Sequence, residues 1–224
     1  MDKEPDKTPK EIVKQLAFEL GFDLVGVCEA EKFQAHRSVV LQRMQDGLME
    51  DLPWYSPARV IRGTDPLALL PEARSIISVA MSYNISENVR LDVSKGRVAR
   101  YAWGDDYHNV LKVRLIKLKE FVQELCKDAK IITSVDTAPL MEKAWAQRAG
   151  LGWIGKHTNL ISRDYGSWLF LGELILDCEL IPDQPFEYDL CGSCSACIDA
   201  CPTNAIVQDY LLDSNKCISY LTIE

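Results

Sequence analysis

The sequence predicts a layered α/β fold over residues 1–180, followed by a smaller cysteine-rich domain over residues 181–224. In the first part, short apolar runs of strand length alternate with segments whose apolar residues recur at helical spacing. In the second part, five of the eight cysteines lie between residues 191 and 217. With 224 residues, 47% of them hydrophobic, the chain can bury a sizeable core.

The first half of the chain predicts one helix and two strands. Thr8, Pro9 and Glu11 are typical of a helix start with a capping box, and the helix is expected to end at Gly21. Residues 22–28 and 75–82 are apolar runs of strand length. Between them lies a segment, residues 54–71, that is rich in proline, arginine and glycine. We expect it to form a long loop with a turn of helix.

The second half continues the alternation of helices and strands. Residues 110–125 form the clearest predicted helix, because their apolar residues fall on one face: Leu111, Leu115, Leu118, Val122 and Leu125. Residues 131–135 and 168–176 are expected to be strands, and residues 139–149 a helix. Proline and acidic residues at 182–189 indicate a linker into the cysteine-rich part.

Four cysteines follow the spacing C-x2-C-x2-C-x3-C, with a proline directly after the last: Cys191, Cys194, Cys197 and Cys201. This spacing is typical of bacterial two-cluster ferredoxins, in which three thiolates bind one [4Fe–4S] cluster and the fourth binds another. The intervening residues are small, so the backbone can approach the cluster and donate N–H groups to its sulfides. Structural zinc and a thioredoxin-like redox pair are the alternatives. Zinc sites usually separate their cysteine pairs by a longer gap, and a redox pair needs two cysteines rather than four.

The cluster ligands are incomplete within this sequence. Three thiolates leave one iron of the first cluster without a ligand, and Cys201 with Cys217 supplies two of the four that a second cluster needs. Either a partner chain supplies cysteines, or the chain is the front part of a longer protein. Cys28, Cys126 and Cys178 stand alone in apolar surroundings, so we interpret them as packing residues.

Composition favours a cytoplasmic protein. The charged N-terminus has no apolar signal region, no uncharged apolar run reaches membrane-spanning length, and cysteines at metal-ligand spacing suit a reducing compartment. The net charge of −8 argues against bulk attraction to nucleic acid. Residues 95–119 nevertheless hold seven basic and two acidic side chains. This segment is either a solvated helix face or a local phosphate-binding patch.

Several longer segments resemble the epoxyqueuosine reductase family closely. They read RYAWGDDYH, AGLGWIGKHTNLI, DYGSWLFLGE and CGSCSACIDACPTNAIV, and the resemblance covers most of residues 10–224. It implies an α/β cobalamin-binding domain followed by part of a ferredoxin-like domain. It also implies a cytoplasmic enzyme that reduces epoxyqueuosine to queuosine at the wobble position of tRNA. The cofactors would be cobalamin and two [4Fe–4S] clusters, with the remaining cluster ligands in a further C-terminal part beyond Glu224.

The resemblance also assigns roles to individual residues. Asp136 falls where the family places its proton donor, although the residues alone favour a cap on the following helix. Arg62, Asn159, Ser167 and Ser219 fall near or within segments that resemble cobalamin contacts. The first cluster is expected on the first three cysteines of the motif and the second on the remaining two candidates: Cys191, Cys194, Cys197, Cys201 and Cys217.

The expected partners are tRNA carrying epoxyqueuosine and an external low-potential electron donor of the ferredoxin or flavodoxin type. We expect a monomer that does not associate with membranes. Two other functions remain open. One is a cobalamin and iron–sulfur oxidoreductase like the reductive dehalogenases, which usually carry an export signal. The other is an electron-transfer protein without a substrate, although roughly 180 residues ahead of the clusters exceed what a minimal ferredoxin needs.

Overall fold

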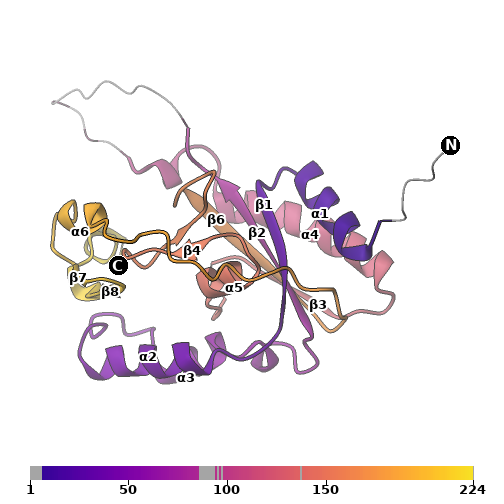
Figure 1. Ribbon diagram of the computed structural model, residues 1–224, viewed down its shortest axis with the longest axis horizontal. Helices are drawn as coiled ribbons and strands as arrows, with labels where there is room; N and C mark the ends of the chain where they lie inside the picture. The colour runs from indigo at the N-terminus through magenta and orange to yellow at the C-terminus, as the bar shows by residue number, and fades with distance from the viewer. Residues whose placement is uncertain (1–6, 86–93, 95, 97, 137, 224) are drawn as a thin grey trace.

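A four-stranded sheet lies at the centre of the structure, a computed structural model that describes residues 7–85, 94, 96, 98–136 and 138–223 (Figure 1). Across the sheet the strands follow the order β1 (Leu24–Glu29), β2 (Ser75–Ser82), β6 (Leu169–Leu176) and β3 (Ile131–Ser134). Every neighbouring pair is antiparallel. Because β2 and β3 both run antiparallel to β6, they run parallel to each other with β6 between them. The layered α/β fold is confirmed, with an antiparallel sheet.

Helices α1 (Pro9–Glu19) and α4 (Tyr107–Leu125) cover one face of the sheet. The predicted capping box of α1 is present: the Thr8 hydroxyl accepts the Glu11 N–H, and the Glu11 carboxylate accepts the Thr8 N–H at 2.7 Å. Four of the five predicted apolar residues of α4 are fully buried against the sheet: Leu111, Leu115, Leu118 and Val122. The periodicity therefore identified the buried face of the longest helix correctly.

Helix α5 (Glu142–Arg148) packs against the opposite face and buries Trp145 completely. It begins three residues later than expected, and the Met141 N–H just before it donates to the Gly63 carbonyl at 3.1 Å. A short hairpin, β4 (Trp153–Ile154) and β5 (Leu160–Ile161), follows α5. Cys28 is buried in this second core, whereas Cys126 and Cys178 pack together against the first.

The segment between β1 and β2 contains more helix than predicted: α2 was not predicted, and residues 54–71 contain a helix and a 3₁₀ turn where one turn of helix was expected. Helix α2 (Gln34–Gln45) buries only Val40, so its sequence carries no apolar stripe. Helix α3 (Pro57–Gly63) and the 3₁₀ turn η1 (Pro66–Ala68) occupy much of the expected loop. The prediction of a long loop over residues 54–71 was therefore wrong in extent. Caps stabilise both short elements: the Ser56 hydroxyl accepts the Arg59 N–H, and Asp65 accepts the Leu67 N–H.

The cysteine-rich segment follows a stretch without regular structure, residues 181–191, that includes the predicted linker. Its short elements are α6 (Ala196–Asp199), β7 (Ile206–Gln208), β8 (Leu211–Leu212), η3 (Ser214–Lys216) and α7 (Ile218–Ile223). Helix α2 lies beside β7 and β8 (Figure 1). The Arg43 guanidinium donates to the Tyr210 carbonyl at 2.7 Å, and Asn215 donates to the Gly47 carbonyl at 2.8 Å. Among the helices described, none has the length and apolarity to cross a membrane.

The basic segment at residues 95–119 lies partly outside the described residues, and two of its arginines contact other parts of the chain. Lys95 and Arg97 lie outside the described residues. The Arg100 guanidinium stacks over the Trp168 ring at 4.9 Å, and Arg114 donates to the Gly21 carbonyl at 2.5 Å. At least these two arginines are therefore engaged with the protein itself.

Candidate functional site

Asp136 lies two residues after the end of β3, in a bend that we call the Asp136 turn, with a left-handed backbone at φ +51°. Its carboxylate accepts a hydrogen bond of 2.5 Å from the Tyr107 hydroxyl and lies 3.2 Å from His108 Nε2. Its backbone N–H donates to Glu142 Oε1 at 2.5 Å. Helix α5 begins at Glu142 without any side-chain cap, so Asp136 does not act as the cap of that helix. The start of α4 and the start of α5 thus meet at Asp136, with α4 at its carboxylate and α5 at its backbone N–H.

The three side chains around Asp136 have pKa values that differ from their ordinary ones. Burial raises the pKa of Glu142 to about 7, although the hydrogen bond from Asp136 opposes the shift. Burial and the contact with Asp136 both raise the pKa of Tyr107. Burial alone would lower the pKa of His108, but its hydrogen bonds to Asp106 and Asp136 give a net rise. About half of the Asp136 side-chain surface stays open to solvent, so the carboxylate can reach a bound molecule.

An aromatic wall connects Asp136 to a small cavity. The Tyr107 ring stacks on Phe170 of β6 at 4.2 Å between centroids, and Phe170 contacts Tyr83 at 4.5 Å. Tyr83 lines a cavity of about 120 Å³ together with six other residues: Lys143, Asn159, Leu160, Ser167, Leu169 and Leu171. Two predicted cobalamin contacts, Asn159 and Ser167, therefore lie in one cavity.

Lys143 links this cavity to the Asp136 turn, because it follows Glu142 in α5 and donates to Asn159 Oδ1 at 2.6 Å. The protein atoms around the ammonium lower the pKa of Lys143, while the charges of Glu142 and Cys217 act in the opposite direction. Cys217 of the cysteine-rich segment therefore lies near the same cavity. More than a third of the Lys143 surface remains exposed, so solvent weakens the desolvation.

The other two predicted contacts, Arg62 and Ser219, do not line the cavity. Both side chains are exposed, Arg62 in α3 and Ser219 in α7. Arg62 precedes Gly63, whose carbonyl binds the segment just before α5. Ser219 comes two residues after Cys217. Both residues therefore lie on elements next to the site.

The cysteine segment carries features that suit an iron–sulfur cluster. Four of the five candidate thiols are partly exposed and Cys194 is exposed. The Cys201 sulfur accepts the Ala205 N–H at 3.3 Å, and backbone N–H groups, that of Ile206 foremost, lower the pKa of Cys201. Such bonds stabilise the thiolate, which is the form that binds iron. Within the described ranges, no three His, Cys, Asp or Glu side chains converge on a point suited to a single metal ion.

The cysteine segment is fastened to the β4–β5 hairpin and to α2. Lys156 in the hairpin pairs with Asp209 at 2.9 Å, and its carbonyl accepts the Tyr210 N–H at 3.0 Å. The Tyr210 hydroxyl in turn donates to Asp189, whose carboxylate accepts the Cys191 N–H at 2.8 Å. The structure thus pairs Lys156 with a carboxylate of the chain.

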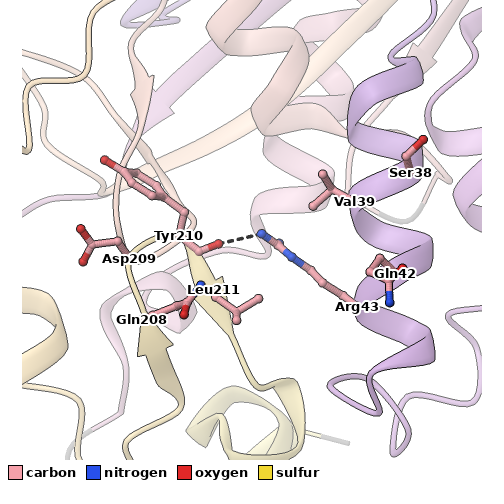
Figure 2. A pocket seen from close by; sticks show the side chains of 8 residues that line it. All are labelled: Ser38, Val39, Gln42, Arg43, Gln208, Asp209, Tyr210 and Leu211. Carbon is pink, nitrogen blue, oxygen red and sulfur yellow. Dashed lines mark hydrogen bonds between the residues drawn. The ribbon is translucent and has the colours of Figure 1, made fainter.

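A groove of about 430 Å³ separates α2 from the β7–β8 turn (Figure 2). Figure 2 shows Arg43 reaching across it from α2 to the Tyr210 carbonyl. The groove contains none of the predicted site residues. Along this groove the cysteine-rich segment contacts helix α2, which was not predicted from the sequence.

Sequence reasoning missed the residues that surround Asp136. Tyr107, His108 and Glu142 lie 29, 28 and 6 residues away in sequence from Asp136. An acidic residue at a helix start is common, so Glu142 carried no distinguishing signal. The adjacent Tyr107 and His108 after an N-capping Asp106 were the available indication, since side chains at a helix start face the ends of neighbouring strands.

Two family models match the chain. "Epoxyqueuosine reductase QueG, DUF1730" matches residues 64–137, and "4Fe-4S double cluster binding domain" matches residues 190–224. The first match ends one residue after Asp136, and the second includes all five candidate cluster cysteines.

Curated relatives cover much of the chain. An epoxyqueuosine reductase of Synechocystis sp. is 51% identical over 70% of this chain and 54% of its own length. One of Cellulophaga algicola is 41% identical over 96% of this chain and 69% of its own length. The chain thus spans between about half and two thirds of these relatives.

Solved structures agree with this assignment. An epoxyqueuosine reductase crystallised with an epoxyqueuosine-modified tRNA-Tyr stem loop has a TM-score of 0.87 and 33% identity, over 95% of this chain and 56% of that chain. The catabolic reductive dehalogenase NpRdhA has a TM-score of 0.54 and 17% identity over 94% of this chain and 28% of that chain, which shows a shared fold alone. By its identity to curated relatives, its structural likeness and the first of the two family models, the chain is a member of the epoxyqueuosine reductase family.

Proposed function

We propose that this chain takes part in the reduction of epoxyqueuosine to queuosine at the wobble position of tRNA. The observation that carries the proposal is the convergence of Tyr107, His108 and Glu142 on Asp136, beside the cavity that holds Asn159 and Ser167. A family member bound to an epoxyqueuosine-modified stem loop supports tRNA as the substrate. We further propose that the chain acts as a cytoplasmic monomer.

The proposed division places cobalamin binding in residues 1–180 and cluster binding in residues 181–224. The first cluster would bind Cys191, Cys194 and Cys197, and the second would bind Cys201 and Cys217. The N–H groups at Cys201 suit this chemistry, because they favour thiolate over thiol. The remaining ligands would come from a further part of the protein or from a partner chain.

We propose that the cavity residues contact one edge of a corrin, because a cavity of about 120 Å³ takes only part of such a ring. Asn159, Ser167 and Lys143 offer hydrogen-bonding groups, and Tyr83 adds an aromatic surface. Arg62 and Ser219 are proposed as outer contacts, because exposed side chains can turn toward a bound ligand. Bound cobalamin would supply a low-valent cobalt, which brings the reducing power that no side chain has.

In this proposal Asp136 holds the proton that the departing epoxide oxygen receives. Removal of that oxygen as water consumes two electrons and two protons, and the electrons come from an external donor of the ferredoxin or flavodoxin type. Tyr107 and His108 hold the Asp136 carboxyl group at a fixed place through one oxygen, Oδ2. The exposed half of the Asp136 side chain then faces the substrate.

The test is Asp136→Asn, which keeps the size of the side chain but cannot supply the proton. We expect turnover of an epoxyqueuosine-containing stem loop to fall by about 10²-fold or more. The absorption spectra of bound cobalamin and clusters should be unchanged. Asp105→Asn is the matched control, because this exposed aspartate lies near the site without contacting Asp136. Wild-type turnover in Asp136→Asn would refute the role of Asp136.

The two alternative functions, an electron-transfer protein and a reductive dehalogenase, predict different results in cobalamin-binding and activity assays. An electron-transfer protein would bind no cobalamin, so reconstitution with cobalamin alone distinguishes it from an enzyme. A dehalogenase would release halide from an organohalide and leave the tRNA unchanged. The structural likeness to a dehalogenase extends to the fold alone, so the tRNA reaction is the proposal that the site supports best.

A further inference from the structure

A side chain from outside the Asp136 turn, that of Glu142, accepts the backbone N–H of Asp136. The Asp136 backbone is left-handed, a conformation that residues with a side chain rarely adopt. Its N–H group donates to Glu142 Oε1 at 2.5 Å. Tyr107 and His108 bind the Asp136 carboxylate and leave the backbone to Glu142. Glu142 is therefore placed to decide whether this turn keeps its shape.

A second carboxyl group, that of Glu173, is buried in the sheet near Glu142. Glu173 of β6 is fully buried, and the register places it opposite Ser78 of β2 and Ser134 of β3. These three residues lie on the α5 side of the sheet, because each is two positions along its strand from a residue of the core around Trp145: Ile76, Ile132 or Ile175. None of their side-chain oxygens has a hydrogen-bond partner among the described residues. Glu142 thus has two neighbouring carboxyl groups, that of the half-exposed Asp136 and that of the fully buried Glu173.

The charged and titratable groups near Glu142 come from each element packed around it. They are Asp136 in the turn, Lys143 in α5, Tyr107 and His108 in α4, and Glu173 in β6. Burial raises the pKa of Glu142 to about 7, and burial with the charge of Glu142 raises the pKa of Glu173 well above its usual range. Both shifts favour the protonated forms, and Glu142 is the member of the pair whose ionised form is stabilised by a hydrogen bond, that from the Asp136 N–H.

We propose that Glu142 is a positioning residue for the reaction proposed above: its carboxylate holds the Asp136 turn in place, and protonation of Glu142 loosens it. This inference rests on the proposed role of Asp136. An ionised carboxylate accepts an N–H bond about twice as strongly as a neutral group does. The hold on the turn consequently strengthens as the pH rises through neutrality.

The experiment follows amide hydrogen exchange of the peptide that contains Asp136, in the intact protein, from pH 5.5 to 8.5 after correction for intrinsic rates. In the wild type, protection should rise with a midpoint near pH 7. Glu142→Gln keeps an oxygen acceptor without a titrating group, so protection should no longer depend on pH. Glu142→Ala should exchange about tenfold faster at pH 8, because the acceptor is lost. Glu124→Ala, an exposed glutamate in α4, is the matched control.

Turnover of the stem loop gives the second measurement. Glu142→Ala should lose about tenfold in kcat, and Glu142→Gln should recover most of it and lose the acid limb of the pH profile. Exchange in Glu142→Ala equal to that in Glu124→Ala would overturn the inference. So would a pH dependence that persists in Glu142→Gln and disappears in Glu173→Gln. If the wild type reduces no epoxyqueuosine, the proposed function fails, while the exchange result still decides whether Glu142 holds the turn.

Discussion

Asp183 fastens the linker after the sheet to the first helix and first strand. Its carboxylate pairs with Lys10 at 3.1 Å and Lys14 at 2.7 Å, and accepts the Val27 N–H at 2.9 Å. Its own N–H donates to the Val27 carbonyl at 2.8 Å. We predict that Asp183→Ala destabilises the protein strongly and that Asp183→Asn does so only weakly.

The expected magnitude follows from what each change removes. The two lysine pairs are partly exposed, so together they contribute about 1 kcal/mol. Alanine also leaves the N–H of fully buried Val27 without an acceptor, which costs about 1–3 kcal/mol. Asp183→Ala should therefore lower the free energy of unfolding by about 2–4 kcal/mol. Asparagine keeps an oxygen for Val27, so Asp183→Asn should cost about 1 kcal/mol.

The pH dependence of the free energy of unfolding tests the ionic contribution of Asp183 independently. Burial alone would raise the pKa of Asp183, but the bonds from Lys14, Val27 and Lys10 give a net lowering. A lowered pKa means that the folded state favours the ionised form. The contribution is fully present above the unfolded pKa of about 3.9 and is lost as the pH falls through the folded value. The difference between wild type and Asp183→Asn should therefore shrink below about pH 4.

Urea unfolding at pH 7 and pH 3.5 measures both effects. Glu187→Ala is the control, because this glutamate is exposed in the same segment and should change stability by less than about 0.5 kcal/mol. Equal costs for Asp183→Asn and Asp183→Ala would refute the role given to the Val27 acceptor. A cost for Asp183→Asn that does not change with pH would refute the ionic part.

Two further predictions concern the core and the cluster. Gly26→Ala would place a methyl group 2.0 Å from the Ala149 carbonyl oxygen, so we expect a loss of about 3 kcal/mol or more in thermal unfolding. Gly96→Ala is its control, because the added methyl group would meet no atom of the described residues within 4 Å, and similar melting of both variants would contradict the packing argument. Cys194→Ser should lower the iron and sulfide bound after anaerobic reconstitution, whereas Cys126→Ser should not. Full iron content in Cys194→Ser would remove this residue from the ligand set.

The amino-acid sequence by itself determined the parts that depend on neighbouring residues. The capping box at Thr8 and the apolar face of residues 111–122 are local, because a helix places residues three and four apart on one side. The strand at residues 75–82 was recognisable as an unbroken apolar run. The cysteine spacing likewise encodes its chemistry within one short loop.

Only the tertiary structure decided what meets at Asp136. Strand β6 enters between β2 and β3 from far along the chain, and this pairing brings Phe170 under Tyr107. Glu142 meets the Asp136 N–H at the start of α5, and the residue before Glu142 is bound to Gly63 at the end of α3. Helix α2 shows no apolar stripe, since its contacts are made mainly with other segments at the surface. Such arrangements follow from contacts between distant segments, and local sequence patterns do not encode those contacts.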